Sequence, residues 1–113
     1  MKRIATPYLF LSPHKKVSRY VVEINNKREV INLYPLKEEI ESTQWLNGVL
    51  VFSVLPEFHF NTKYTFKELI EKLTNGMHLA ELDKLPSPLY VYYINPVNLA
   101  NLSFYSVPQV IRM

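Results

Sequence analysis

The stretch Thr43-Gln44-Trp45-Leu46-Asn47-Gly48-Val49-Leu50-Val51-Phe52-Ser53-Val54-Leu55 is the most apolar run of the chain and decides its fold. It holds the only tryptophan and one of only two glycines, and it is rich in β-branched and aromatic residues. Such a run fits a strand buried on both faces better than an amphipathic helix. We therefore expect a central strand here, opened by the Asn47-Gly48 turn signal, against which the rest of the chain packs.

Three further strands are expected before this run. Arg3–Leu11 is apolar and aromatic, and Val17–Ile24 alternates with the period of two that is typical of a half-buried strand. The segment Asn25-Asn26-Lys27 favours a turn, because asparagine tolerates positive φ, and Glu29–Tyr34 then runs back. The pattern predicts an antiparallel hairpin or meander, followed by a loop over residues 36–42.

One helix is predicted with its cap. Thr65-Phe66-Lys67-Glu68 is a capping box, in which the Thr65 hydroxyl accepts from the Glu68 N–H and the Glu68 carboxylate accepts from the Thr65 N–H. An apolar stripe at helical spacing follows, made by Phe66, Leu69, Ile70 and Leu73. Asn75-Gly76 supplies a left-handed stop, so the spacing predicts a helix over Phe66–Thr74.

The C-terminal part returns to strand patterns. Leu89–Ile94 is a strong strand by composition, and Gln109–Met113 favours a short terminal strand. A second short helical turn is expected within Met77–Leu85. The predicted fold is therefore mainly β, a β-sandwich-like antiparallel or mixed sheet, with one amphipathic helix inserted between N- and C-terminal strands. The length of 113 residues indicates a single domain, 1–113.

Composition excludes several classes of function. A hydrophobic content of 48% with 20% charged residues, and no apolar stretch long enough to span a bilayer, predicts a soluble protein without membrane contact. Pro7 and the polar Pro13-His14-Lys15-Lys16 interrupt the apolar start, which is a poor signal peptide, so we expect a cytoplasmic protein. The absence of cysteine removes thiolate chemistry and Cys-ligated zinc.

Candidates for catalysis are few. His59 beside Glu57 is the best pair, because a carboxylate can orient an imidazole as a base, but a histidine in an aromatic loop is the commoner explanation. His14, His59 and His78 lack the spacing of a metal site. With no glycine-rich phosphate loop, no cofactor is expected. The alternative function kept open is a small hydrolase or metal-dependent enzyme using His59 and Glu57, with Asp83 as a further candidate.

A net charge of +3 is too small to imply a polyanion partner. Lys15, Lys16 and Arg19 with the tyrosines form the nucleic-acid alternative, but the basic patch is typical of a solvated hairpin tip. We favour a non-catalytic domain that acts through protein association or self-association, as a homodimer or an accessory to another protein. The candidate interaction residues are the aromatic ones of the connection and the late strand, namely Phe58, Phe60, Tyr90, Tyr92 and Tyr93.

The order of elements also resembles a known domain. The stretch Ile40–Ser53, with Thr43, Trp45, Asn47-Gly48 and Val49-Leu50-Val51, looks like the approach to the barrel in the amidohydrolase superfamily. The segments Tyr90-Val91-Tyr92, Val97–Leu102 and Val110–Met113 look like the strands that complete the small β-sandwich, or composite, domain of that family.

The resemblance implies a domain without its catalytic barrel. In the family a Pro-Gly pair precedes a metal-binding His-x-His, and without a gap these positions fall on Phe52-Ser53 and on Phe58 and Phe60, which bind no metal. A shift by one residue brings His59 onto a single ligand position. A barrel of roughly 250 residues does not fit this chain. The resemblance thus implies that Tyr64–Leu85 stands in its place.

Overall fold

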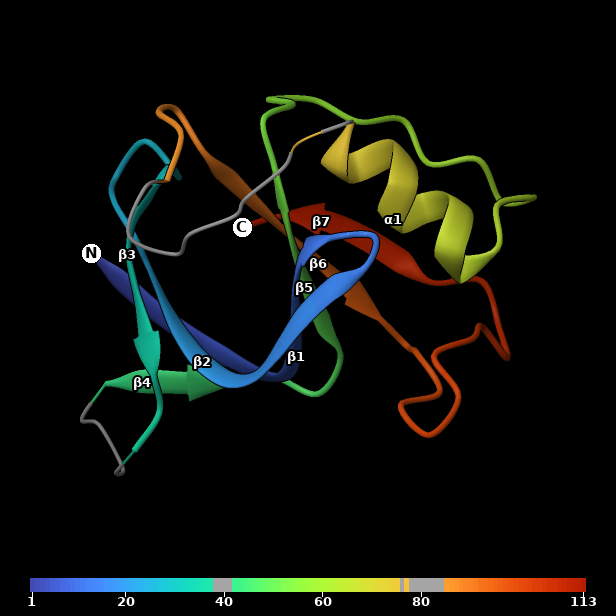
Figure 1. Ribbon diagram of the computed structural model, residues 1–113, viewed down its shortest axis with the longest axis horizontal. Coiled ribbons are helices and arrows are strands. Elements are labelled where there is room, and N and C mark those ends of the chain that lie inside the picture. Colours follow the sequence, from blue (N-terminus) through green and yellow to red (C-terminus); the bar gives the residue numbers. More distant parts are fainter. Residues whose placement is uncertain (38–41, 76, 78–84) are drawn as a thin grey trace.

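The computed structural model describes residues 1–37, 42–75, 77 and 85–113. Its strands form one mixed seven-stranded sheet in the order β3-β2-β1-β5-β6-β7, while β4 pairs with β1 (Figure 1). The fold is mainly β with one helix between the N- and C-terminal strands, which confirms the prediction. The elements are β1 (Lys2–Ser12), β2 (Lys15–Ile24), β3 (Val30–Pro35), β4 (Thr43–Trp45), β5 (Val49–Ser53), α1 (Phe66–Thr74), β6 (Tyr90–Asn95) and β7 (Gln109–Arg112).

Strand β1 organises the sheet because it takes two parallel partners along one edge. Its residues Arg3–Ala5 pair with β4, and its residues Tyr8–Phe10 pair with β5. Pro7 lies between these two pairings, and proline has no N–H to donate to a ladder. Antiparallel β2 and β3 complete the predicted meander on the other edge of β1.

The run from Thr43 to Leu55 is therefore two strands, and the prediction of one continuous strand was wrong. The chain leaves β1 at Leu46, whose N–H donates to the Ala5 carbonyl at 2.9 Å, and rejoins it at Val49. Gly48 between them has φ +153°, and a Cβ there would lie 2.5 Å from the Ile94 carbonyl oxygen. The prediction that the apolar part is buried on both faces is confirmed, since every residue of β5 is buried.

Two hydrophobic clusters lie on opposite faces of β5. The sheet cluster is built by strand residues and Leu89 alone, namely Ile4, Leu9, Leu11, Val22, Ile24, Leu50, Phe52, Leu89 and Val91. The helix cluster joins the apolar stripe of α1 to the sheet, through Phe10, Val49, Val51, Phe66, Leu69, Ile70, Leu73, Tyr92, Ile94 and Val97. Alternation along β5 sends Leu50 and Phe52 to one cluster and Val49 and Val51 to the other.

The sheet curls around the sheet cluster until two distant segments meet. The Val30 N–H at the start of β3 donates to the Leu89 carbonyl just before β6, at 2.7 Å. Figure 1 shows the pronounced bend of the β1–β2 hairpin that accompanies this curl. Met77 and Leu85 pack against the sheet cluster, but most of the predicted second helical turn lies outside the described residues.

Helix α1 begins and ends where its sequence predicts. The capping box is formed in both directions, and Asn75 at the C-terminus is left-handed with φ 46°. The buried Ser53 hydroxyl at the end of β5 donates to the Leu73 carbonyl at 2.5 Å, which ties the last turn of the helix to the sheet. Within the described residues no helix combines the length and the apolar character needed to cross a membrane.

Candidate functional site

The predicted catalytic pair does not form a site. His59 and Glu57 lie in the connection between β5 and α1, and both side chains are exposed. No hydrogen bond links them among the described side chains. Among all the residues that the structure describes, no group of three or more histidine, aspartate or glutamate side chains could hold a metal ion. His14 is exposed in the β1–β2 turn, and His78 and Asp83 lie outside the described residues.

The five aromatic residues predicted as an interaction surface serve mainly in packing. Tyr92 is only 3% exposed and belongs to the helix cluster, and its hydroxyl donates to the Leu55 carbonyl at 2.7 Å. Burial accordingly raises the pKa of Tyr92. Phe58, Phe60 and Tyr90 pack against the same cluster, whereas Tyr93 packs against the sheet cluster. None of these five is among the large apolar side chains that are exposed in the described part of the chain.

The strongest polar cluster centres on Glu23 of β2, which is 8% exposed. Its carboxylate accepts from Arg3 Nε at 2.7 Å, from Asn32 Nδ2 at 3.0 Å and from the Tyr34 hydroxyl at 3.1 Å. The hydrogen bond from Arg3 lowers the pKa of Glu23, and burial opposes that effect. Because each of these groups has its partners, the cluster joins β1, β2 and β3 rather than offering a reactive group.

The main path of the sheet ends at β3 and at β7, and the β7 end is open among the described strands. The Met113 N–H donates to the Val91 carbonyl, and Ile111 lies opposite Tyr93. Antiparallel alternation therefore turns the N–H and C=O groups of Val110 and Arg112 away from β6. The side chain of Ile111 is 45% exposed, and Tyr105 and Val107 in the preceding segment are more exposed still.

The opposite edge, β3, is blocked. Pro35 has no N–H, and the Asn32 side chain accepts from the Leu33 N–H at 2.9 Å. The Val30 N–H is bonded to Leu89, and a register shift interrupts the pairing of β2 with β3 beside it. These are devices that keep sheet edges from pairing with another chain. On β7, by contrast, Pro108 lies just before the strand, so the outward N–H groups of Val110 and Arg112 stay available.

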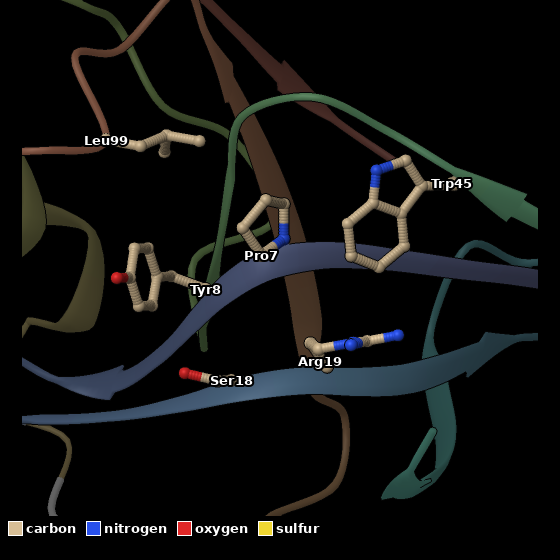
Figure 2. A pocket seen from close by; sticks show the side chains of 6 residues that line it. All are labelled: Pro7, Tyr8, Ser18, Arg19, Trp45 and Leu99. Carbon is tan, nitrogen blue, oxygen red and sulfur yellow. The ribbon is translucent and has the colours of Figure 1, made fainter. Parts of the chain in front are cut away.

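A surface hollow of about 450 Å³ lies where the pairing partner of β1 changes from β4 to β5. Its lining residues are Pro7, Tyr8, Ser18, Arg19, Trp45 and Leu99. Figure 2 shows Trp45 and Arg19 on one side of Pro7, and Tyr8 with Ser18 on the other. Trp45 is 45% exposed, although it is the only tryptophan of the chain. The hollow thus presents two aromatic side chains and a guanidinium at one place.

A change of face in both strands of the hairpin forms this hollow. In a regular strand, residues an odd number of positions apart point to opposite faces. Ile4 and Leu9 are an odd number of positions apart, but both contact the sheet cluster, and the same holds for Val17 and Val22. The change occurs in β2 at Arg19, which has φ 57°, a conformation that non-glycine residues rarely adopt. The local backbone therefore turns the Arg19 side chain out beside Pro7.

Comparisons with known proteins found no matching family model, no matching curated protein and no matching solved structure. The resemblance to the amidohydrolase composite domain therefore stays a prediction. The open β7 edge and the hollow are the surface features of the described residues that bear on what the chain does.

Sequence reasoning missed both features for identifiable reasons. Ile111 was placed in a terminal strand, but its exposure depends on β7 being the last strand of the sheet. Trp45 was assigned to a buried strand because its neighbours are apolar. Its position beside an Asn-Gly turn signal was the one available clue, since a strand that ends there leaves its last side chain near the surface.

Proposed function

We propose that this protein acts by self-association, as a homodimer that pairs the β7 strands of two chains. The observation that carries the proposal is the open β7 edge with the exposed Ile111 at its centre. Homodimers are mostly two-fold symmetric, so the same surface must fit itself. An open strand edge satisfies this condition when it pairs antiparallel with its copy.

The register of such pairing follows from Pro108, which cannot donate. The outward-facing residues of β7 are Val110 and Arg112, so the pairing that uses both sets Val110 of each chain opposite the partner's Arg112. Ile111 then lies on the two-fold axis against the partner's Ile111. Centring the pair on Val110 instead would place Arg112 against the partner's Pro108 and lose hydrogen bonds.

The positive charge of Arg112 does not oppose the pairing of two β7 strands. The Arg112 guanidinium turns back to its own chain, where it donates to the Pro56 carbonyl at 2.9 Å and to the Lys27 carbonyl at 3.3 Å. It also lies 4.1 Å from the centre of the Tyr90 ring. A short strand with flanking apolar side chains buries a modest area, which suits a reversible dimer with a Kd on the order of micromolar.

The test is the mass in solution, by light scattering, over a concentration series that spans about 1–200 µM, the range in which a micromolar dimer dissociates. Wild type should pass from one chain to two. Ile111→Lys should remain a single chain throughout, because two lysines would face each other across the axis. Val110→Pro should also remain monomeric, since it removes an outward N–H that the dimer would use and no hydrogen bond between β7 and β6.

The matched control is Ile31→Lys, which places the same charge on the blocked edge strand β3 at a side chain that is 51% exposed. It should dimerise as wild type does. A mass of one chain at every concentration would contradict the proposal, as would equal loss of dimer in Ile31→Lys. Far-UV circular dichroism of each variant separates loss of dimer from loss of fold.

A further inference from the structure

The hollow beside Pro7 carries cationic groups as well as aromatic ones. Among the described residues the one ion pair is Arg3–Glu23, so the guanidinium of exposed Arg19 has no carboxylate partner there. The Lys16 ammonium lies 4.8 Å from the centre of the Tyr8 ring, and Tyr8 lines the hollow. None of the lining residues is acidic. The described lining of the hollow therefore carries positive charge and no negative charge.

A third cation adjoins Arg19 through the backbone. The Leu36 N–H donates to the Arg19 carbonyl at 2.8 Å, and the exposed Lys37 follows Leu36 in the chain. The basic residues thus follow β2 from its turn to the hollow, and they do not gather at one point. An extended polyanion matches such a track better than a compact ion does.

We propose that this hollow binds single-stranded nucleic acid. One base stacks on the exposed face of Trp45, a neighbouring base reaches Tyr8, and Arg19 donates to a phosphate between them. Aromatic side chains beside a cationic track are the usual means of holding a single strand, because every base offers a flat π-face. The guanidinium fork of arginine matches the geometry of a phosphate.

Other flat or extended ligands use only part of this surface. A proline-rich peptide would dock on Trp45 and Tyr8 but has no need of Arg19, Lys16 and Lys37. A duplex presents no free base face to an indole. The conjunction of half-exposed Trp45 with Arg19, which has no carboxylate partner among the described residues, is therefore what favours a single strand. This inference goes beyond self-association and does not depend on it.

The first readout uses Trp45 itself, since it is the only tryptophan in the chain. A single-stranded oligonucleotide of about ten uridines, a length typical for one binding surface, is titrated into the protein at low salt. Stacking should quench the tryptophan emission saturably. Emission that stays constant while a labelled copy of the same strand gains no anisotropy would overturn the proposal.

Variants then locate the site by fluorescence anisotropy of the labelled strand. Trp45→Ala should weaken binding by about tenfold, the loss expected for one stacked base. Arg19→Asn should weaken binding and reduce the slope of log Kd against log salt by about one, because one phosphate contact is lost. Asparagine is chosen because it tolerates the positive φ at this position.

Arg28→Asn is the matched control, because Arg28 is also exposed and also has positive φ, 61°, but lies in the β2–β3 turn. It should bind as wild type does. Ile111→Lys should also bind normally, so failure of the dimer leaves this test intact. Equal loss in Arg28→Asn, equal affinity for a duplex, or affinity for uridine monophosphate equal to that for the strand would each overturn the proposal.

Discussion

Glu23 shows at the scale of one residue how this chain accommodates a charge inside a sheet. Three donors from β1 and β3 surround its carboxylate, and the hydrogen bond from Arg3 is the main cause of its lowered pKa. A buried carboxylate without such donors would destabilise the fold. The residue therefore links the meander strands most strongly while it is ionised.

The first prediction concerns pH. The pKa of Glu23 is lower in the folded chain than its ordinary value of 4.5, so its contribution is fully present above that value and is lost as pH falls through the folded pKa. Glu23→Gln should lower the free energy of unfolding at pH 7 by about 1–3 kcal/mol. Thermal unfolding from pH 7 to pH 3 should show the difference from wild type shrinking.

Glu71→Gln provides the comparison, because Glu71 is exposed on α1. It should follow the wild-type curve at all pH values. A constant difference between Glu23→Gln and wild type down to pH 3 would contradict an ionised Glu23 as the linking group.

At the scale of the element, α1 depends on local signals for its ends and on tertiary contacts for its stability. Nine residues are too few for a stable isolated helix. Its cap sets where it begins, while Phe66, Leu69, Ile70 and Leu73 bury the stripe that retains it. Phe66 also meets Phe10 of β1 edge to face, with ring centres 5.5 Å apart.

The second prediction tests the cap. Thr65→Ala removes the hydroxyl that accepts from the Glu68 N–H, so the free energy of unfolding should fall by about 1 kcal/mol. Thr65→Ser keeps a hydroxyl and should lose little. Urea unfolding followed by circular dichroism measures both variants. If Thr65→Ser were as unstable as Thr65→Ala, packing of the Thr65 methyl group would be the cause instead.

At the scale of the whole molecule, the sheet is held by contacts between distant segments. The curl that joins Val30 to Leu89 leaves the β3 edge blocked and the β7 edge open. An open edge makes the stability of the molecule depend on its concentration if that edge pairs with a copy, because association favours the folded chain.

The third prediction follows from this linkage. The thermal midpoint of wild type should rise by a few degrees, as expected for about 1–2 kcal/mol, when the concentration rises from well below to well above the Kd of the dimer. Differential scanning calorimetry measures it. The midpoint of Ile111→Lys should be independent of concentration, and an equal rise in that variant would point to nonspecific association.

Local signals allowed part of this molecule to be predicted. The capping box and the Asn75 stop define α1 through contacts within a few residues, and the period of two located β2 for the same reason. The mostly β fold class, the N-terminal meander and the terminal strand also followed from pattern and composition. The division of the central run into β4 and β5 could not be predicted from local signals. It depends on the close approach of Gly48 to the carbonyl of Ile94, which is distant in the sequence.

The sequence by itself determined which segments become strands or helix, since propensity, capping and turn chemistry act over a few neighbouring residues. Only the tertiary structure decided which side chains reach the surface. Trp45 and Arg19, from different strands, meet beside Pro7 because β1 exchanges partners there. Ile111 lies beside an unpaired edge because no described strand follows β7 in the sheet. Pairing between distant segments has no short-range signal, and both candidate sites depend on it.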